Sequence, residues 1–291
     1  MTTLRSVFIG SNGIRAGWRL CIYLALVTLL TLGFGTILYF TTHHDLSNAK
    51  VITPSLILEA DLAILIPMLI AAFVMSRIEH RPVSDYGLPF YEAFRGRFWF
   101  GAFVGFLSLT LVLAIIFIGK DLQVAVSTAP LGSIIFGGVA FAIAMVVVGI
   151  TEEFLYRGYA LTTLAQGIGF WPAATLLSFV FASLHALNAG ESPLGIVQVY
   201  VFAIAMCYTF WRTGTLWFAV GFHSAWNWAE TFFFGVPNSG HLSESSFLNG
   251  TLTGAAWFAG GSDGPEGSFL AIVVLIVLIP VINRIAPPRH L

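Results

Sequence analysis

Charged side chains are scarce in this chain of 291 residues. Asp, Glu, Lys and Arg make up 9% of it, whereas soluble domains carry roughly 25%. Hydrophobic residues make up 57% of the chain, and the mean hydropathy is +0.88. This composition excludes an ordinary soluble domain and predicts a multi-pass membrane protein. The net charge of −1 excludes the basic surface of a nucleic-acid binder, so no nucleic-acid partner is expected.

Cysteine is almost absent. The two cysteines, Cys21 and Cys207, both lie inside apolar stretches. Their positions support neither a disulfide framework nor a zinc site built from thiolates. The sequence also shows no internal repeat and no low-complexity tract.

Long apolar stretches dominate the rest of the chain. A transmembrane helix needs about 20 apolar residues, and eight stretches approach that length, which predicts an all-α transmembrane helical bundle of about eight spans. We expect one domain over 18–285, preceded by a cytoplasmic segment 1–17 and followed by a cytoplasmic tail 286–291. The third span contains Gly101 and Gly105, at a spacing that lets helices pack closely. The predicted spans are 18–40, 55–76, 98–119, 138–165, 172–189, 193–211, 215–235 and 269–285.

The positive charges are distributed unevenly along this predicted bundle. Every Lys and Arg except Lys50 and Lys120 falls at the end that holds both termini. Because cytoplasmic loops carry an excess of Lys and Arg, we expect both termini in the cytoplasm. An even number of spans agrees with that placement.

Three polar features lie between the predicted spans or at their ends. Residues 77–99 form either an interfacial segment on the cytoplasmic side or a solvated loop. Residues 238–268 are rich in Gly and Ser and are expected to form a long external loop. Glu59 and Asp61 lie near the start of the second span. We expect them at the outer membrane interface, with a second polar site as the alternative.

One span contains an acidic pair within apolar sequence. Gly149–Gly158 reads GITEEFLYRG, which includes Glu152, Glu153 and Arg157. An ionisable group held in hydrocarbon costs at least a few kcal/mol and is by default functional. On a helix, Glu153 and Arg157 are four residues apart and can pair, whereas Glu152 is rotated by about 100°. We therefore expect Glu153 to hold the arginine and Glu152 to face a different helix.

Two later spans carry polar residues at a comparable depth. His185 follows Phe181 by one helical turn, and His223 precedes Asn227 by one turn. Counting about 1.5 Å per residue from the nearest turns puts Glu152 and His185 both roughly 25 Å into their helices. A single intramembrane histidine is often only a hydrogen-bonded packing residue. Two His, one Asn and two Glu on three helices instead predict a polar cavity inside the bilayer.

This set of side chains suits hydrolysis of an amide by activated water. A glutamate in an apolar cavity can take a proton from water, with a neutral histidine beside it sharing that water. The second histidine and the asparagine amide are suitable donors for a developing oxyanion. The alternative is a zinc site with Glu152, His185 and His223 as ligands and an open fourth position. The sequence has no HExxH motif, and these ligands would come singly from three helices.

The motifs resemble those of a known family of membrane proteins. EEFLYRG resembles the EExxxR signature of the CPBP family, which includes type II CAAX prenyl endopeptidases and bacteriocin-processing or immunity proteins. Phe181–His185 is similar to its FxxxH motif, and His223–Asn227 is similar to its HxxxN motif. The flanking sequences RPVSDYGL, RTGTLW and DGPEG also resemble the family, so the resemblance extends from about Arg77 to the C-terminus.

The resemblance implies an intramembrane endopeptidase of the CAAX type. It implies that Glu152 activates the water with His185 as its partner. His223 and Asn227 would then stabilise the oxyanion. The set of site residues carried over from the resemblance is Glu152, Glu153, Arg157, His185, His223 and Asn227.

The resemblance also bears on cofactors, partners and location. We expect no cofactor, with a divalent metal such as zinc as the alternative. The expected partners are membrane lipid and a peptide or protein substrate, lipid-anchored in some cases. The expected location is a prokaryotic plasma membrane, in which the chain is a multi-pass integral protein.

Two other functions compete with the peptidase. A non-catalytic membrane scaffold or immunity factor would have no reason to keep all six polar residues. A small-solute or proton-coupled transporter often shows repeats or interrupted helices at the membrane midplane, and this sequence shows no such repeat. We therefore favour the peptidase. Within it we favour the glutamate alone over zinc, since one carboxylate cannot easily serve as both metal ligand and base.

Overall fold

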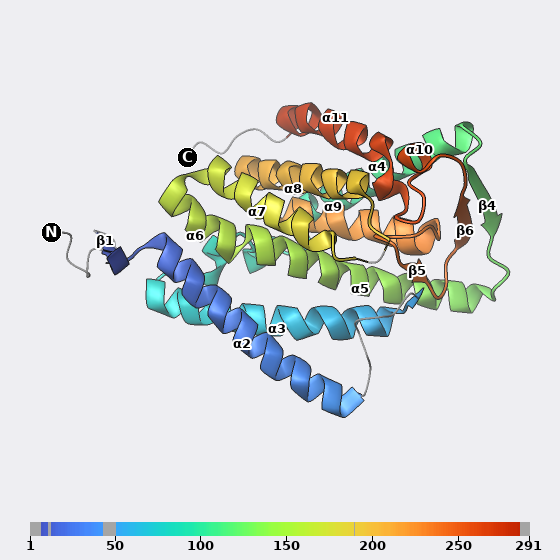
Figure 1. Ribbon diagram of the computed structural model, residues 1–291. Coiled ribbons are helices and arrows are strands. Elements are labelled where there is room, and N and C mark those ends of the chain that lie inside the picture. Colours follow the sequence, from blue (N-terminus) through green and yellow to red (C-terminus); the bar gives the residue numbers. More distant parts are fainter. Residues whose placement is uncertain (1–6, 11–12, 43–50, 189, 286–291) are drawn as a thin grey trace.

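The computed structural model describes residues 7–10, 13–42, 51–188 and 190–285. These residues form a bundle of helices, with most of the short strands gathered at one end and the strand β1 near the N-terminus at the other (Figure 1). Residues 1–6 of the predicted N-terminal segment and the predicted tail 286–291 lie outside the described residues.

The long helices follow the predicted spans. Each predicted span overlaps one of them, except that the span predicted over 138–165 is divided into two helices at Gly158. A Cβ at this position would lie 2.3 Å from the carbonyl oxygen of Phe154, so a larger residue would not fit at the division. The bounds are α2 Ala16–Thr42, α3 Pro54–Glu79, α4 Gly96–Ile118, α5 Leu131–Arg157, α6 Tyr159–Ile168, α7 Phe170–His185, α8 Pro193–Thr213, α9 Trp217–Trp228 and α11 Phe269–Ile285.

Local sequence explains where two of these helices begin. The Thr53 hydroxyl accepts a hydrogen bond from the backbone N–H of Leu56 (3.2 Å), and a proline follows it at the first helical position of α3. The Ser192 hydroxyl accepts from the N–H of Gly195 (3.0 Å), and α8 likewise begins with a proline. Both arrangements satisfy an N–H that the first turn of a helix leaves free.

Five helical segments are long and apolar enough to cross a membrane. They are α2, α3, α4, the combined α5–α6 stretch and α8. α7 and α11 are apolar but shorter, and α9 has 12 residues. The described residues therefore form a mostly helical integral membrane protein. The count of eight spans and the cytoplasmic placement of the termini stay predictions.

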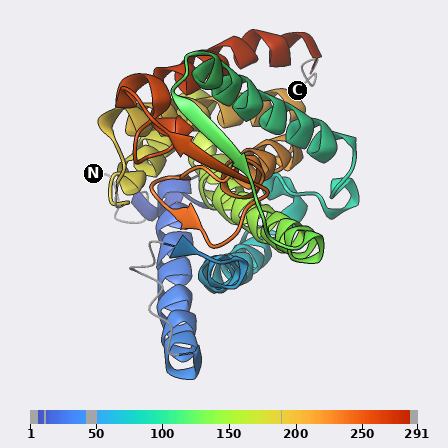
Figure 2. The same cartoon turned by 90° about the vertical axis from the view of Figure 1, so that its right-hand side faces the viewer.

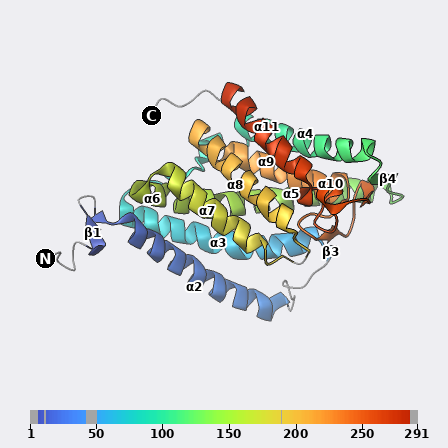
Figure 3. The same ribbon diagram turned by 45° about the horizontal axis from the view of Figure 1, so that its top comes forward.

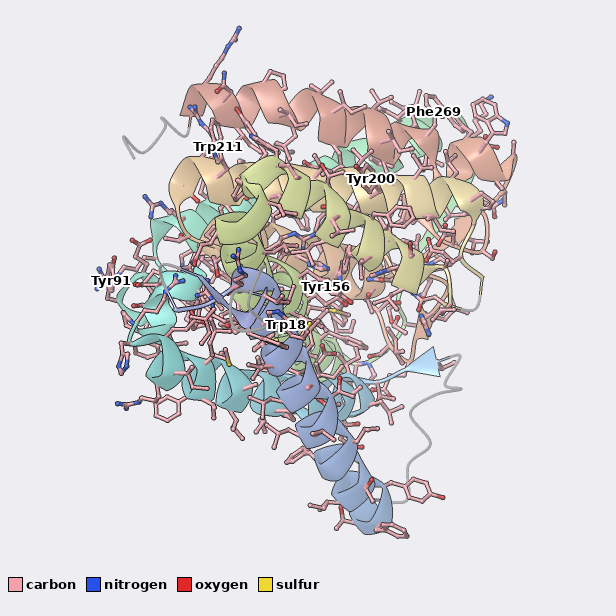
Figure 4. All side chains as sticks on the ribbon, turned by 60° about the vertical axis from the view of Figure 1, so that its left-hand side comes forward. Trp18, Tyr91, Tyr156, Tyr200, Trp211 and Phe269 are labelled. Atoms are coloured by element: carbon pink, nitrogen blue, oxygen red, sulfur yellow. The ribbon has the colours of Figure 1, made fainter. Side chains whose placement is uncertain are left out.

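The helices are arranged so that α5 and α9 lie inside the bundle. α4 and α5 pack on α9, α3 packs on α5, and α2 lies on the outer side of α3. α7 packs beside α8, and α11 covers α8 (Figures 1 and 3). The second half of α2 diverges from the rest of the bundle, as Figure 4 shows. The predicted catalytic motif on α5 therefore lies in the interior, covered on several sides.

α4 and α9 pack against each other through glycine. A Cβ at Gly101 would lie 2.1 Å from the carbonyl oxygen of Phe218, and one at Gly105 would lie 2.3 Å from that of Phe222. Both glycines therefore let the two backbones touch, as the predicted close-packing pair requires. This contact fixes the position of α9, which carries His223.

One end of the bundle is covered by strands and loops, which face the viewer in Figure 2. β3 pairs with β5 in parallel, and β4 pairs with β6 in antiparallel register. α2 begins and α11 ends at the opposite end (Figure 1). The strand bounds are β1 Ile9–Gly10, β2 Gly13–Ile14, β3 Val51–Ile52, β4 Leu122–Val126, β5 Leu242–Ser243 and β6 Leu248–Leu252.

The segment predicted as a long external loop, residues 238–268, is largely built into this covering. It contributes β5, β6, the short helix α10 (Ala256–Ala259) and the 3₁₀ turn η4 (Pro265–Gly267). We call residues 238–268 together with β3 the cap. The segment 77–99 at the other end contains two 3₁₀ turns, η1 Val83–Tyr86 and η2 Phe90–Glu92.

Candidate active site

A cavity of about 270 Å³ lies between the cap and the interior helices. Residues of α3, α5, α7, α8 and α9 line it, together with residues of the cap. Apolar side chains make up much of the wall, including Phe181 and Phe202. Tyr156 on α5 is partly buried and packs edge-on against Phe181, with ring centroids 4.8 Å apart. Apolar and polar side chains therefore share the wall of the cavity.

The direction of the helices shows which residues lie deepest. α3 and α5 run away from the cap, whereas α9 runs toward it (Figure 1). The last lining residue along α3 is Asp61, the last along α5 is Glu152, and the first along α9 is His223. These three side chains form what we call the floor of the cavity. Its rim, on the cap side, includes Asn238, Ser239, His241 and Glu266.

The two adjacent glutamates of α5 have separate surroundings. Glu152 lines the cavity, and its side chain is 29% exposed. Glu153 is fully buried, and its Oε1 accepts a hydrogen bond from Nη1 of Arg157 at 2.9 Å. The guanidinium of Arg157 also lies over the ring of Phe181, 5.0 Å from its centroid. The predicted division between the two acids is therefore present in the structure.

His223 lies between the two glutamates. Its Nδ1 is 3.0 Å from Oε1 of Glu153, and its Nε2 is 3.6 Å from Oε2 of Glu152. An ionised carboxylate can only accept a hydrogen bond, so Nδ1 of His223 carries the proton that is donated to Glu153. Glu153 thereby fixes the orientation of the ring and directs Nε2 at Glu152 and the cavity. The ring of Phe202 packs against His223 edge-on, with centroids 4.9 Å apart.

His185 lines the same cavity from the end of α7. Its Nδ1 is 2.9 Å from the carbonyl oxygen of Phe181 and donates to it, which leaves Nε2 free for a ligand. Among the described residues no ion pair joins His185 to Glu152. The family resemblance implied that His185 is the partner of Glu152. In the structure, the histidine within 4 Å of the Glu152 carboxylate is His223.

Asn227 lies one turn beyond His223 on α9 and also lines the cavity. It is 9% exposed. The hydrogen bonds of the described residues include none to its side chain, so the amide is available to a substrate. Four of the six predicted site residues therefore line the cavity, and the other two, Glu153 and Arg157, are buried behind it.

The zinc ligands of the alternative prediction come from three different helices. Glu152, His185 and His223 all line the cavity. The part of the chain that the structure describes contains no group of three or more His, Cys, Asp or Glu side chains arranged to hold a metal ion.

The location of one floor residue differs from the main expectation from the sequence. Asp61 was expected at the outer membrane interface, but its side chain lines the cavity together with Glu152. Gln198 on α8 was not singled out, although it lines the cavity and is 1% exposed. No described group hydrogen-bonds its Oε1. In the sequence, Gln198 is a single polar residue within an apolar stretch, whereas Asp61 follows Glu59 near the start of the second span.

Comparison with protein families identifies the central part of the chain. A family model described as Rce1-like, type II CAAX prenyl endopeptidase Rce1-like, matches residues 134–229. This Rce1-like segment runs from α5 to the end of α9, so it contains all six predicted site residues. It confirms the resemblance to the CPBP family and indicates a protease of the CAAX type in a membrane.

The Rce1-like segment does not include the whole cavity. Asp61 on α3 and the cap residues of the rim lie outside the matched range. A comparison with curated proteins gave no match.

Proposed function

We propose that the chain is an intramembrane endopeptidase whose Glu152 activates water to hydrolyse a peptide bond. The substrate is a membrane-associated or lipid-anchored polypeptide. The observation that carries this proposal is the floor of the cavity, where the Glu152 carboxylate lies 3.6 Å from Nε2 of His223. A water molecule beside a carboxylate and an imidazole nitrogen at that separation can contact both groups, and the carboxylate can take its proton.

The other site residues fit the roles of orientation and oxyanion binding. Glu153 holds His223 through Nδ1, and Arg157 holds Glu153. The Asn227 amide faces the cavity and can donate to the carbonyl oxygen as it gains charge. Nε2 of His185, at the end of α7, is a second group that can contact the substrate.

We propose that the reaction uses no metal. A zinc ion held by Glu152, His185 and His223 would take up the only carboxylate among the six predicted site residues that lines the cavity, because Glu153 is held by Arg157 and His223. Glu230, further along the chain after α9, is fully buried and does not line the cavity.

We further propose that substrate enters from the outer face of a prokaryotic plasma membrane. The Arg-rich segment 77–99 lies at the end of the bundle opposite the cap, and positive loops face the cytoplasm. An impermeant thiol reagent tests this orientation in cells that express Glu244→Cys or Tyr91→Cys in a background without Cys21 and Cys207. Glu244→Cys in the cap should react in intact cells, and Tyr91→Cys only after permeabilisation. The reverse pattern would overturn the orientation.

A library of membrane peptides, with and without lipid anchors, tests the proposed activity. Purified wild-type protein and Glu152→Gln protein are incubated with it, and new peptide termini are scored by mass spectrometry. We expect termini that appear with the wild type and are absent with folded Glu152→Gln protein. If the folded wild type produces none across the library, a non-catalytic scaffold or immunity factor becomes the better description.

A further inference from the structure

The floor of the cavity holds two carboxyl groups rather than one. Asp61 lines the cavity from α3 and interacts electrostatically with Glu152 and His223. It is half-buried on α3, two residues after Glu59 and at the start of a run of apolar residues. A charged residue at such a position in a membrane helix is by default functional.

Among the described residues, no Lys or Arg side chain neutralises the carboxyl groups of Asp61 and Glu152. Arg157 is engaged by Glu153, and no Lys or Arg of the described residues forms an ion pair with Asp61 or Glu152. Two neighbouring carboxyls that are partly buried repel each other when both are ionised, and this repulsion favours a pair that retains one proton. Nε2 of His223 lies 3.6 Å from Glu152, whereas the ion pairs of the described residues include none to Asp61, so Asp61 is the carboxyl of the two that can hold a proton for the reaction.

Peptide hydrolysis requires a proton donor as well as a base. The base removes a proton from the attacking water, but the departing nitrogen is a very poor leaving group until it is protonated. The proposed function assigns the base to Glu152. None of the other residues assigned to the site so far is a carboxylic acid that holds a proton at the floor of the cavity.

We propose that Asp61 is a second catalytic carboxyl, which donates its proton to the leaving amide nitrogen. This inference rests on the proposed function, because it requires that the cavity hydrolyses peptide bonds. It adds α3, outside the Rce1-like segment, to the catalytic machinery.

The proton transfers balance over one turnover. The Glu152 carboxylate accepts a proton as the water oxygen bonds to the carbonyl carbon. Asp61 gives its proton to the nitrogen as the carbon–nitrogen bond breaks, which yields a free amine and a new carboxylic acid. Glu152 is then protonated and Asp61 ionised, and transfer of the proton from Glu152 to Asp61 restores the starting state.

A pair of substrates with the same acyl sequence separates the two roles. One has an amide at the cleaved bond, and the other has an activated aryl ester whose phenolate leaves without protonation. Asp61→Asn should lower the turnover of the amide by roughly 10²–10⁴-fold and leave ester turnover within about threefold of the wild type. Glu152→Gln should abolish both reactions, because both need activated water.

The ester also reports whether Asp61→Asn has a folded site, since a misfolded protein cleaves neither substrate, and thermal unfolding shows whether Glu152→Gln is folded. Glu59→Gln is the matched control, because Glu59 is on α3 but does not line the cavity. It should cleave both substrates at the wild-type rate.

Three results would overturn the inference. An amide turnover of Asp61→Asn within threefold of the wild type would remove Asp61 from catalysis and leave the proposed function standing. Equal losses on amide and ester would make Asp61 a structural residue. A wild type that cleaves neither substrate would overturn the proposed function and this inference together.

Discussion

Glu152 and Glu153 are neighbours in the sequence but have different surroundings in the fold. Glu152 is 29% exposed toward the cavity, whereas Glu153 is fully buried between Arg157 and His223. Loss of the Glu152 charge removes a base from a cavity that can admit water. Loss of the Glu153 charge leaves a buried guanidinium without its partner, which is costly in a low-dielectric interior.

Glu153→Gln should therefore destabilise the protein by about 3–5 kcal/mol, while Glu152→Gln should keep the wild-type stability. Thermal unfolding of both variants in the same detergent measures the difference. Equal losses of folded protein in the two variants would contradict this division of roles.

Asn227 is assigned to the oxyanion because its amide faces the cavity one turn beyond His223. Asn227→Ala should lower kcat by roughly 10²–10³-fold with little change in KM, as removal of an oxyanion donor does. Asn283→Ala, in α11 and away from the cavity, serves as the control. A higher KM with kcat intact would instead make Asn227 a substrate-binding residue.

At the scale of elements, the contact between α4 and α9 holds the floor in place. Gly105 touches the backbone of Phe222, the residue before His223. Gly105→Ala should therefore push α9 away from α4, lower the thermal stability by about 1–3 kcal/mol and reduce activity. The matched control is Gly33→Ala in α2, where an added Cβ meets nothing within 4 Å. Similar stability in both variants would show that α4 and α9 tolerate separation.

The loop between α7 and α8 contains an acid that faces other acids. Burial, with further contributions from Asp263 and Glu266, raises the pKa of Glu191 from 4.5 to about 8. The folded protein therefore keeps a proton that the unfolded chain has lost between these pH values, so folding stability falls as pH rises through this window.

Glu191→Gln cannot ionise and should show a shallower loss of stability between pH 5 and about 9 than the wild type. Melting temperatures across this range, with exposed Glu244→Gln as the control, measure the effect. Parallel curves for wild type and Glu191→Gln would show that Glu191 does not contribute to the pH dependence.

The elements and the motif residues were predictable from sequence, because both depend on local patterns. The lengths of the apolar stretches predicted the helices. The rotation between adjacent residues of a helix predicted that Glu152 and Glu153 face different directions. The pairing of Glu152 with His223 and the position of Asp61 could not be predicted in this way. Both depend on how α3, α5 and α9 are rotated against each other, and that rotation is set by distant contacts such as Gly105 on Phe222. The strands of the cap depend likewise on pairing between segments far apart in sequence.

At the scale of the whole molecule, the bundle places a polar floor inside an apolar interior and covers it with the cap. The Arg157–Glu153–His223 series holds the histidine, and the histidine contacts Glu152. Four helices thereby bring Asp61, Glu152, His185 and Asn227 to one cavity of about 270 Å³. The central claim that follows is that water activated by Glu152 cleaves a peptide bond without a metal.

The most direct test is cleavage of the best peptide from the library in oxygen-18 water, with the zinc content of the same protein samples measured by elemental analysis. We predict incorporation of the label into each new C-terminal carboxylate by the wild type, and full activity after exhaustive chelation. Folded Glu152→Gln should release no labelled product. Cleavage by Glu152→Gln at a rate near that of the wild type, or wild-type activity that tracks occupancy by one zinc per chain, would contradict the account.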